Sequence, residues 1–191
     1  MPSERAVGAT TTKLYVATVS GLPSFMVFPE NPTGNLNLFI SPSCNDCELL
    51  MLNVLAAYKN NDPYFSKIRT TFSLMPANTE DVDLISGFLC IDNNRRAKAI
   101  KDYYTLINQK IGRGVITSQI ARDTYTSIMN AYGISGVKQN DCEANKANRA
   151  IVGNVYKIGD KYRTQDVVPL VLYNDRNLNV IRFADLQRAM R

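Results

Sequence analysis

Residues 38–47, with the sequence LFISPSCNDC, decide the fold of this protein. The first three of them end a run of large apolar side chains that begins at Leu36, which is typical of a buried β-strand. From Cys44 onward the apolar side chains recur every three or four residues, the period of an amphipathic α-helix, until residues 60–63. The two cysteines therefore lie at the start of a helix that directly follows a buried strand.

A Cys-x-x-Cys motif in this place has a chemical consequence. Unpaired backbone N–H groups and the helix dipole make the N-terminus of a helix positive, which stabilises a thiolate on Cys44. Cys47 lies one turn further along on the inward face, where it is placed to resolve a mixed disulfide formed by Cys44. The spacing alone is not specific, because two such cysteines are also half of a zinc site.

The composition excludes several other kinds of chemistry. The 191 residues include four cysteines and no histidine, which removes Cys–His and Ser–His–Asp catalysis and most zinc sites. We therefore expect no metal and no cofactor. With 45% hydrophobic and 20% charged residues, the chain has the proportions of a globular protein, and no apolar run is long enough for a membrane span. The net charge of +5 is modest and scattered, so we expect no nucleic-acid partner.

After the cysteine helix, the sequence predicts a second strand and a long helical block. Residues 68–75 have the composition of a strand that closes at Pro76, so the fold starts as a strand–helix–strand unit. Residues 79 to about 158 have the pattern of almost continuous helix. Helices are expected to begin at Thr79, at Asn93 or Asn94, at Thr117 and at Asp141.

The two ends of the chain contribute further elements. Residues 1–33 predict an N-terminal arm or short strands, and the strand signal returns near the C-terminus. The expected elements are strands or extended segments at 13–19 and 24–28, a strand at 167–173, its hairpin partner at 178–183 and a helix at 184–190. At Val168-Pro169 a proline opens a strand, which fits a cis peptide bond beside the dithiol. An ordinary trans proline on an edge strand is the alternative.

These segments together resemble one family. Residues 38–47 look like the strand and active-site turn of bacterial DsbA/DsbC-type thioredoxin-fold proteins, and VPLVL at residues 168–172 looks like their cis-proline strand. The helical block occupies the place of that family's helical insertion. The resemblance implies an α/β thioredoxin fold, βαβ followed by ββα, over residues 34–191. The insertion lies at about 79–158, and residues 1–33 precede the domain.

The resemblance also implies a function. It is that of a thiol–disulfide oxidoreductase, a DsbA-like oxidase or DsbC-like isomerase or reductase, acting on cysteine-containing client proteins. Cys44 would be the nucleophile, Cys47 the resolving cysteine, and Val168 and Pro169 the substrate-binding pair. We expect a second redox protein to regenerate the pair, a monomer, and a periplasmic or other oxidising extracytoplasmic location, although the chain shows no signal peptide. The alternatives are a redox-inactive binding or assembly module and a four-cysteine zinc module.

The other two cysteines match a further feature of the family. In DsbC-like domains, an insertion cysteine followed by a charged stretch pairs with a later cysteine before the final insertion helix. Cys90 and Cys142 have this placement, so the resemblance implies a structural disulfide between them. Such a bridge would point to an oxidising compartment. Two unpaired buried thiols are the alternative.

The sequence also departs from the family at the dipeptide between the active-site cysteines. Asn45-Asp46 is neither the Pro-His of typical DsbA nor the Gly-Tyr of typical DsbC. The carboxylate of Asp46 places negative charge near Cys44 and should offset part of the helix-terminus effect. We therefore expect both residues to tune the redox pair, and the protein to be a weaker oxidant than typical DsbA.

Three carboxylates open the helical block: Glu80, Asp81 and Asp83. Such a cluster raises the question of a cation site. Acidic side chains are favoured in the first turn of a helix, because they interact with the positive end of the helix dipole. We therefore interpret them as first-turn residues of a helix that begins near Thr79.

Overall fold

The computed structural model describes residues 13–162 and 168–191. A six-stranded sheet in the order β1-β2-β4-β3-β5-β6 organises them. Its strands are β1 (Leu14–Thr18), β2 (Ser24–Pro29), β3 (Gly34–Ile40), β4 (Ile68–Leu74), β5 (Leu170–Tyr173) and β6 (Arg176–Asn177). Strands β3 and β4 are parallel, and every other pair is antiparallel. The two N-terminal strands thus extend the same sheet that carries the cysteine motif.

Helix α2 (Asn45–Lys59) makes the crossover between the parallel strands β3 and β4. A short 3-10 helix, η1 (Phe65–Lys67), leads from it into β4. Parallel strands need such a crossover because a tight turn cannot reverse the chain twice. The strand–helix–strand unit predicted around residues 38–47 is therefore confirmed.

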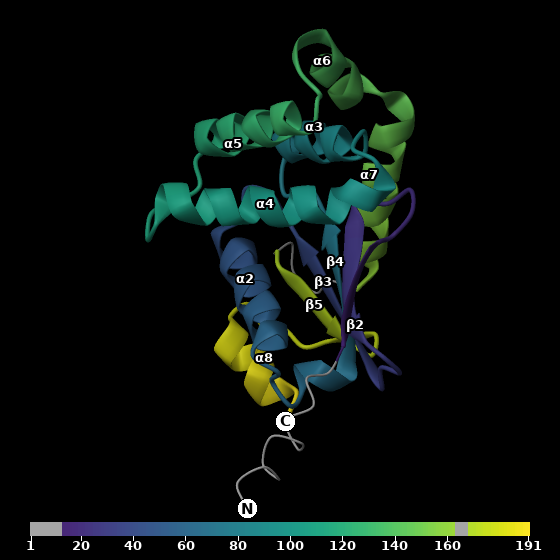
Figure 1. The fold of residues 1–191 in the computed structure, drawn as a ribbon, viewed down its shortest axis with the longest axis vertical. Helices are drawn as coiled ribbons and strands as arrows, with labels where there is room; N and C mark the ends of the chain where they lie inside the picture. Colours follow the sequence, from purple (N-terminus) through teal and green to yellow (C-terminus); the bar gives the residue numbers. More distant parts are fainter. Residues whose placement is uncertain (1–12, 163–167) are drawn as a thin grey trace, which may run out of the picture.

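The helical block follows β4 and forms an insertion before β5. Its helices are α3 (Thr79–Phe88), α4 (Asn93–Ile111), α5 (Ser118–Ala131), α6 (Gly136–Ala144) and α7 (Lys146–Lys161). In Figure 1, α4 runs across one end of the sheet, α3 and α5 lie beyond α4, and α7 runs alongside the sheet. The C-terminal helix α8 (Phe183–Ala189) lies beside α2, and the rings of Phe65 and Phe183 stack there with centroids 5.7 Å apart.

Alternation along the strands divides the core between two faces of the sheet. On β3, Leu36, Leu38 and Ile40 belong to the cluster on the α2 face. Phe39 points the other way and packs in a smaller cluster with Leu170, Leu172, Met75 and the α7 residue Val155. This is the period-2 pattern of a strand with both faces covered.

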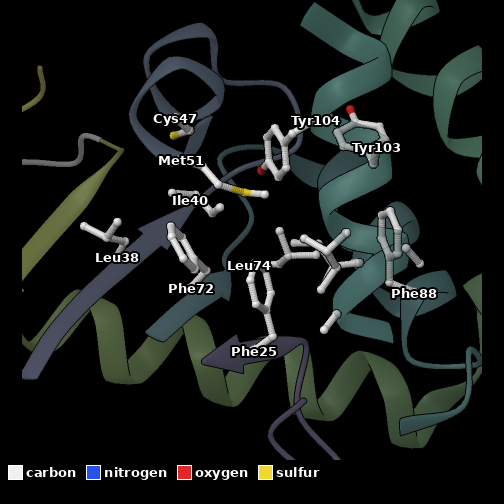
Figure 2. Close-up of a cluster of buried hydrophobic side chains, with 14 of the residues drawn as sticks. Phe25, Leu38, Ile40, Cys47, Met51, Phe72, Leu74, Phe88, Tyr103 and Tyr104 are labelled. Atoms are coloured by element: carbon white, nitrogen blue, oxygen red, sulfur yellow. The ribbon is translucent and has the colours of Figure 1, made fainter. Parts of the chain in front are cut away.

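The larger cluster runs without a break from the sheet into the insertion. Figure 2 shows Leu38 and Ile40 on β3 and Cys47 and Met51 on α2, and the same cluster continues to Tyr104, Tyr103 and Phe88. Phe88 and Tyr103 contact edge to face, with ring centroids 5.8 Å apart. Because the two parts share one core, the insertion is held rigidly against the strand and helix that carry the cysteines.

The helix expected to begin at Asp141 is wrong. Asp141 lies inside α6, and a new helix, α7, begins only after Asn145. Asn145 has extended backbone angles, and its side chain accepts a hydrogen bond from Asn148 N at 2.9 Å. An asparagine in this conformation is a good N-cap. It therefore separates α6 from α7, where the sequence pattern predicts a single helix from Asp141.

The hairpin partner expected at residues 178–183 is also wrong. Asn174 and Asp175 both have positive φ angles, 48° and 64°, and form a two-residue turn. A two-residue turn reverses the chain direction immediately after β5, so the strand that pairs with β5 is β6 (Arg176–Asn177). Asn179 has a φ of 51°, and the following residues up to α8 are not a strand.

Candidate active site

Cys44 and Cys47 form a disulfide at the N-terminus of α2, with their Cα atoms 5.2 Å apart. Cys44 is the N-cap residue, and its Sγ accepts a hydrogen bond from the backbone N–H of Cys47 at 3.1 Å. Cys47 is fully buried, whereas Cys44 is half-buried. Figure 2 shows Cys47 beside Met51 in the core. Of the two sulfurs, Cys44 is the one placed for contact with another protein.

Val168 and Pro169 lie next to this disulfide. The peptide bond between them is cis, Pro169 is buried, and β5 begins at the next residue. The Val168 carbonyl oxygen lies 3.7 Å from Cys44 Sγ. Strand β5 pairs with β3, which runs directly into the cysteine turn, so the sheet brings these distant residues together. Residue 167, the expected first residue of this strand, lies outside the described residues.

Asn45 and Asp46 have different environments, although both are in the same dipeptide. The Asn45 side chain donates to the Gly114 carbonyl and accepts from the Ile116 N–H, each at 2.8 Å. It therefore joins the start of α2 to the loop between α4 and α5. Asp46 is exposed and lines an open hollow with residues 179–182 and Asp185. Asp46 is thus exposed to solvent, whereas Asn45 is half-buried.

The second disulfide joins Cys90 and Cys142, whose Cα atoms are 6.0 Å apart. It links the end of α3 to α6, within the insertion. The neighbouring turn is held by Arg96, which is only 4% exposed. Its guanidinium donates to the carbonyls of Phe88, Leu89, Ile91 and Leu22 at 2.8–3.2 Å. These bonds hold the turn that follows α3 and tie it to Leu22, which precedes β2.

The four sulfurs do not converge on one point, because they form two separate disulfides. In the described part of the chain, no group of three or more Cys, Asp, Glu or His side chains is arranged to hold a metal ion. A four-cysteine zinc module is therefore inconsistent with the structure. No helix among the described residues is both long and apolar enough to cross a membrane.

Two buried carboxyl groups near the cysteines were not assigned a site role from the sequence. Asp81 is 1% exposed and binds the turn before Cys44, so its interpretation as an ordinary first-turn carboxylate is incomplete. Glu48, next to Cys47, is also 1% exposed. The sequence could have indicated the burial of Glu48, because this residue lies on the inward side of α2, four residues after Cys44. No comparable sequence pattern indicates the burial of Asp81.

Glu48 predicts a pH dependence of stability. Burial raises the pKa of its carboxyl above the usual 4.5, although a hydrogen bond from Asn108 acts in the opposite direction. The folded protein thus binds this proton more tightly than the unfolded chain does. The contribution of Glu48 to stability is fully present below pH 4.5 and is lost as pH rises through the raised pKa.

We therefore expect Glu48→Gln to gain stability relative to the wild type as pH rises from about 4.5 towards neutrality. The measurement is denaturant unfolding of both oxidised proteins at several pH values, with the difference in unfolding free energy plotted against pH. A constant offset would reflect packing and hydrogen bonding. A difference that does not change with pH would therefore show that the carboxyl group has the same pKa in both states.

Together these features define a thioredoxin fold with a helical insertion and a Cys-x-x-Cys disulfide beside a cis-proline strand. Solved structures with high-probability similarity include DsbA from Chlamydia trachomatis, with a TM-score of 0.64 and 14% identity over 91% of each chain. Oxidised BdbD from Bacillus subtilis has a TM-score of 0.64 and 9% identity over 95% of this chain and 97% of its own.

A third similar structure is MdbA of Corynebacterium matruchotii, described as a thiol-disulfide oxidoreductase. It has a TM-score of 0.60 and 13% identity over 95% of this chain and 94% of its own. No protein-family model matches the sequence, and no curated protein matches it significantly. At these identities the likeness shows the fold. The α/β thioredoxin fold predicted from the sequence is confirmed.

Proposed function

We propose that this protein is a thiol–disulfide oxidoreductase that exchanges disulfides with cysteine-containing client proteins through Cys44. The observation that carries the proposal is the environment of Cys44 Sγ. It caps a helix, accepts the Cys47 N–H at 3.1 Å, and lies 3.7 Å from the Val168 carbonyl oxygen. A helix N-terminus stabilises a thiolate, so Cys44 is suited both to attack a disulfide and to leave from one.

In the oxidising direction, a client thiolate attacks Cys44 Sγ and the Cys44–Cys47 bond breaks. Cys47 leaves as a thiolate in the buried position, where the backbone N–H of Ser41 faces its Sγ at 3.5 Å. A second client thiolate then attacks the client sulfur of the mixed disulfide, and Cys44 leaves. The client gains a disulfide and the protein gains two thiols. The reverse sequence reduces or rearranges a client disulfide.

Client binding is assigned to the backbone at Val168 and Pro169. An extended client segment that pairs with this backbone would donate an N–H to the Val168 carbonyl, which lies beside Cys44 Sγ. Main-chain pairing of this kind suits clients of different sequence. Val115, on the loop held by Asn45, is 72% exposed and adds an apolar contact near the same site.

The cycle uses sulfur chemistry alone, so the proposal includes no cofactor. It does require a second redox protein that returns the cysteine pair to its working state. The structural disulfide between Cys90 and Cys142 supports an oxidising compartment such as the bacterial cell envelope, because cytosolic thiols are kept reduced. We further propose that the protein acts as a monomer.

The test is oxidation of a reduced peptide that contains two cysteines, with glutathione disulfide present to regenerate the protein. Substoichiometric protein is expected to accelerate peptide oxidation, with many turnovers per molecule. The reverse activity is measured as reduction of insulin by dithiothreitol. Rates equal to those of the small-molecule reagents alone in both assays would instead identify a binding or assembly module.

Asp46 offers a further prediction on redox tuning. Asp46 is exposed and lies two residues after Cys44 in the sequence. Asp46→His should therefore remove negative charge near the Cys44 sulfur and stabilise the Cys44 thiolate. We expect the thiolate to titrate at lower pH and the couple to become more oxidising. Thiolate absorbance against pH and equilibration with glutathione measure the two effects. A thiolate that titrates at the same or higher pH would show that the backbone N–H groups set the redox balance.

A further inference from the structure

Ser41 connects the cysteine pair to the helical insertion. It lies between β3 and α2 and is fully buried. Its backbone N–H faces Cys47 Sγ at 3.5 Å, and its carbonyl accepts the Tyr104 hydroxyl at 2.8 Å. Its own hydroxyl donates to Asp81 Oδ2 at 2.6 Å. Each polar group of Ser41 is therefore engaged, and only the N–H is directed at a redox-active sulfur.

Asp81 is the centre of this network on the insertion side. Its Oδ2 also accepts from the Ser43 hydroxyl at 3.0 Å and from the Ala77 N–H at 2.8 Å. The residue is 1% exposed at the start of α3. One carboxylate oxygen thus binds two residues of the turn that leads into Cys44 and the backbone that leads into α3.

A role confined to the α3 terminus does not account for this arrangement. Asn78 already caps that helix, because its side chain accepts the Asp81 N–H at 2.9 Å. Burial raises the pKa of the Asp81 carboxyl, against the effect of the hydrogen bonds from Ser41, Ala77, Ser43 and Asn78. Burying the Asp81 carboxylate away from water destabilises the fold. An exposed carboxylate in the first turn would interact favourably with the helix dipole without this desolvation penalty.

We propose that Asp81 is a positioning residue for the cysteine pair, which holds Ser41 so that its N–H stays directed at Cys47 Sγ. This inference rests on the proposed redox function. The sulfur of a reduced cysteine, above all as a thiolate, accepts a hydrogen bond better than the sulfur of a neutral disulfide does. A fixed N–H donor at Ser41 therefore favours the reduced form of the cysteine pair. Asp81 thereby makes the Cys44–Cys47 disulfide easier to reduce and the protein a stronger oxidant.

The test is the equilibrium constant for reduction of the protein disulfide by glutathione, in which two glutathione thiols become one glutathione disulfide. Asp81→Ala and Ser41→Ala are expected to lower this constant by about threefold to tenfold, the effect of losing one positioned hydrogen bond. Asp81→Asn keeps an acceptor oxygen for Ser41 and should stay closer to the wild-type value than Asp81→Ala does.

Ser43→Ala is the matched control. It removes a hydrogen bond to the same carboxylate oxygen and the 3.1 Å contact between the Ser43 and Ser41 hydroxyls, but it leaves the bond from Ser41 to Asp81. Its equilibrium constant should therefore stay within about twofold of the wild type. Thermal unfolding of the oxidised variants reports the purely structural effect. If Asp81→Ala does not fold, Ser41→Ala against Ser43→Ala decides the question.

The inference is overturned if Ser41→Ala has the wild-type equilibrium constant, because the tie to Asp81 would then have no redox effect. It is also overturned if Asp81→Asn shifts the constant as far as Asp81→Ala, since charge and not position would then be responsible. A wild-type protein that does not equilibrate with glutathione at all would instead contradict the proposed function.

Discussion

Cys44→Ser is expected to abolish thiol–disulfide exchange, whereas Cys47→Ser should leave one reactive thiol that is trapped on its clients. Cys44 is the half-buried sulfur at the helix N-cap, and Cys47 is fully buried behind it. A hydroxyl at residue 44 neither attacks a disulfide nor leaves from one. With Cys47 replaced, Cys44 still attacks, but nothing within the protein resolves the mixed disulfide.

Peptide oxidation and insulin reduction measure the first effect, and the expected rate for Cys44→Ser is that of the reagents alone. Non-reducing gel electrophoresis after mixing Cys47→Ser with an oxidised client measures the second. The double variant Cys44→Ser and Cys47→Ser is the control and should form no adduct. If a limiting amount of alkylating reagent labels Cys47 before Cys44 in the reduced wild type, the two roles are reversed.

Removing the Cys90–Cys142 disulfide is expected to cause the largest loss of stability. The bridge joins residues that are 52 apart in sequence. Closing this disulfide therefore removes considerable conformational entropy from the unfolded chain. The chain-entropy relation gives about 4 kcal/mol for a loop of this size. The variant Cys90→Ala and Cys142→Ala should therefore unfold at much lower denaturant concentration than the wild type.

A matched control removes the other disulfide. Cys44 and Cys47 are only three residues apart, and the same relation gives roughly half the stabilisation for so short a loop. Unfolding of both double alanine variants in denaturant, with the unfolding free energy and its dependence on denaturant concentration fitted for each variant, separates the two contributions. Equal losses for the two pairs would contradict the entropic explanation. Peptide mapping that finds Cys90 and Cys142 as free thiols would remove the basis of the prediction.

The sequence by itself determined the centre of the fold. A change of apolar period from strand to helix at Cys44 is a local signal, and it placed β3, α2 and the cysteine pair correctly. The proline after Val168 marked the other segment at the site. The sequence did not separate α6 from α7 or find the short strand β6, because the backbone conformation of one or two residues decides each boundary: Asn145 for the helices, and Asn174 with Asp175 for the strand.

Only the tertiary structure decided what surrounds the cysteine pair. Ser41 and Asp81 are 40 residues apart in sequence, and Asn45 meets Ile116 across 71. Local rules place Asp81 in a first helical turn, where such a residue is usually exposed. Its burial follows from packing the insertion and the sheet into one core, which no periodicity encodes. Hydrogen bonds between distant segments depend on that packing, so the sequence located the reactive sulfurs but not the groups that position them.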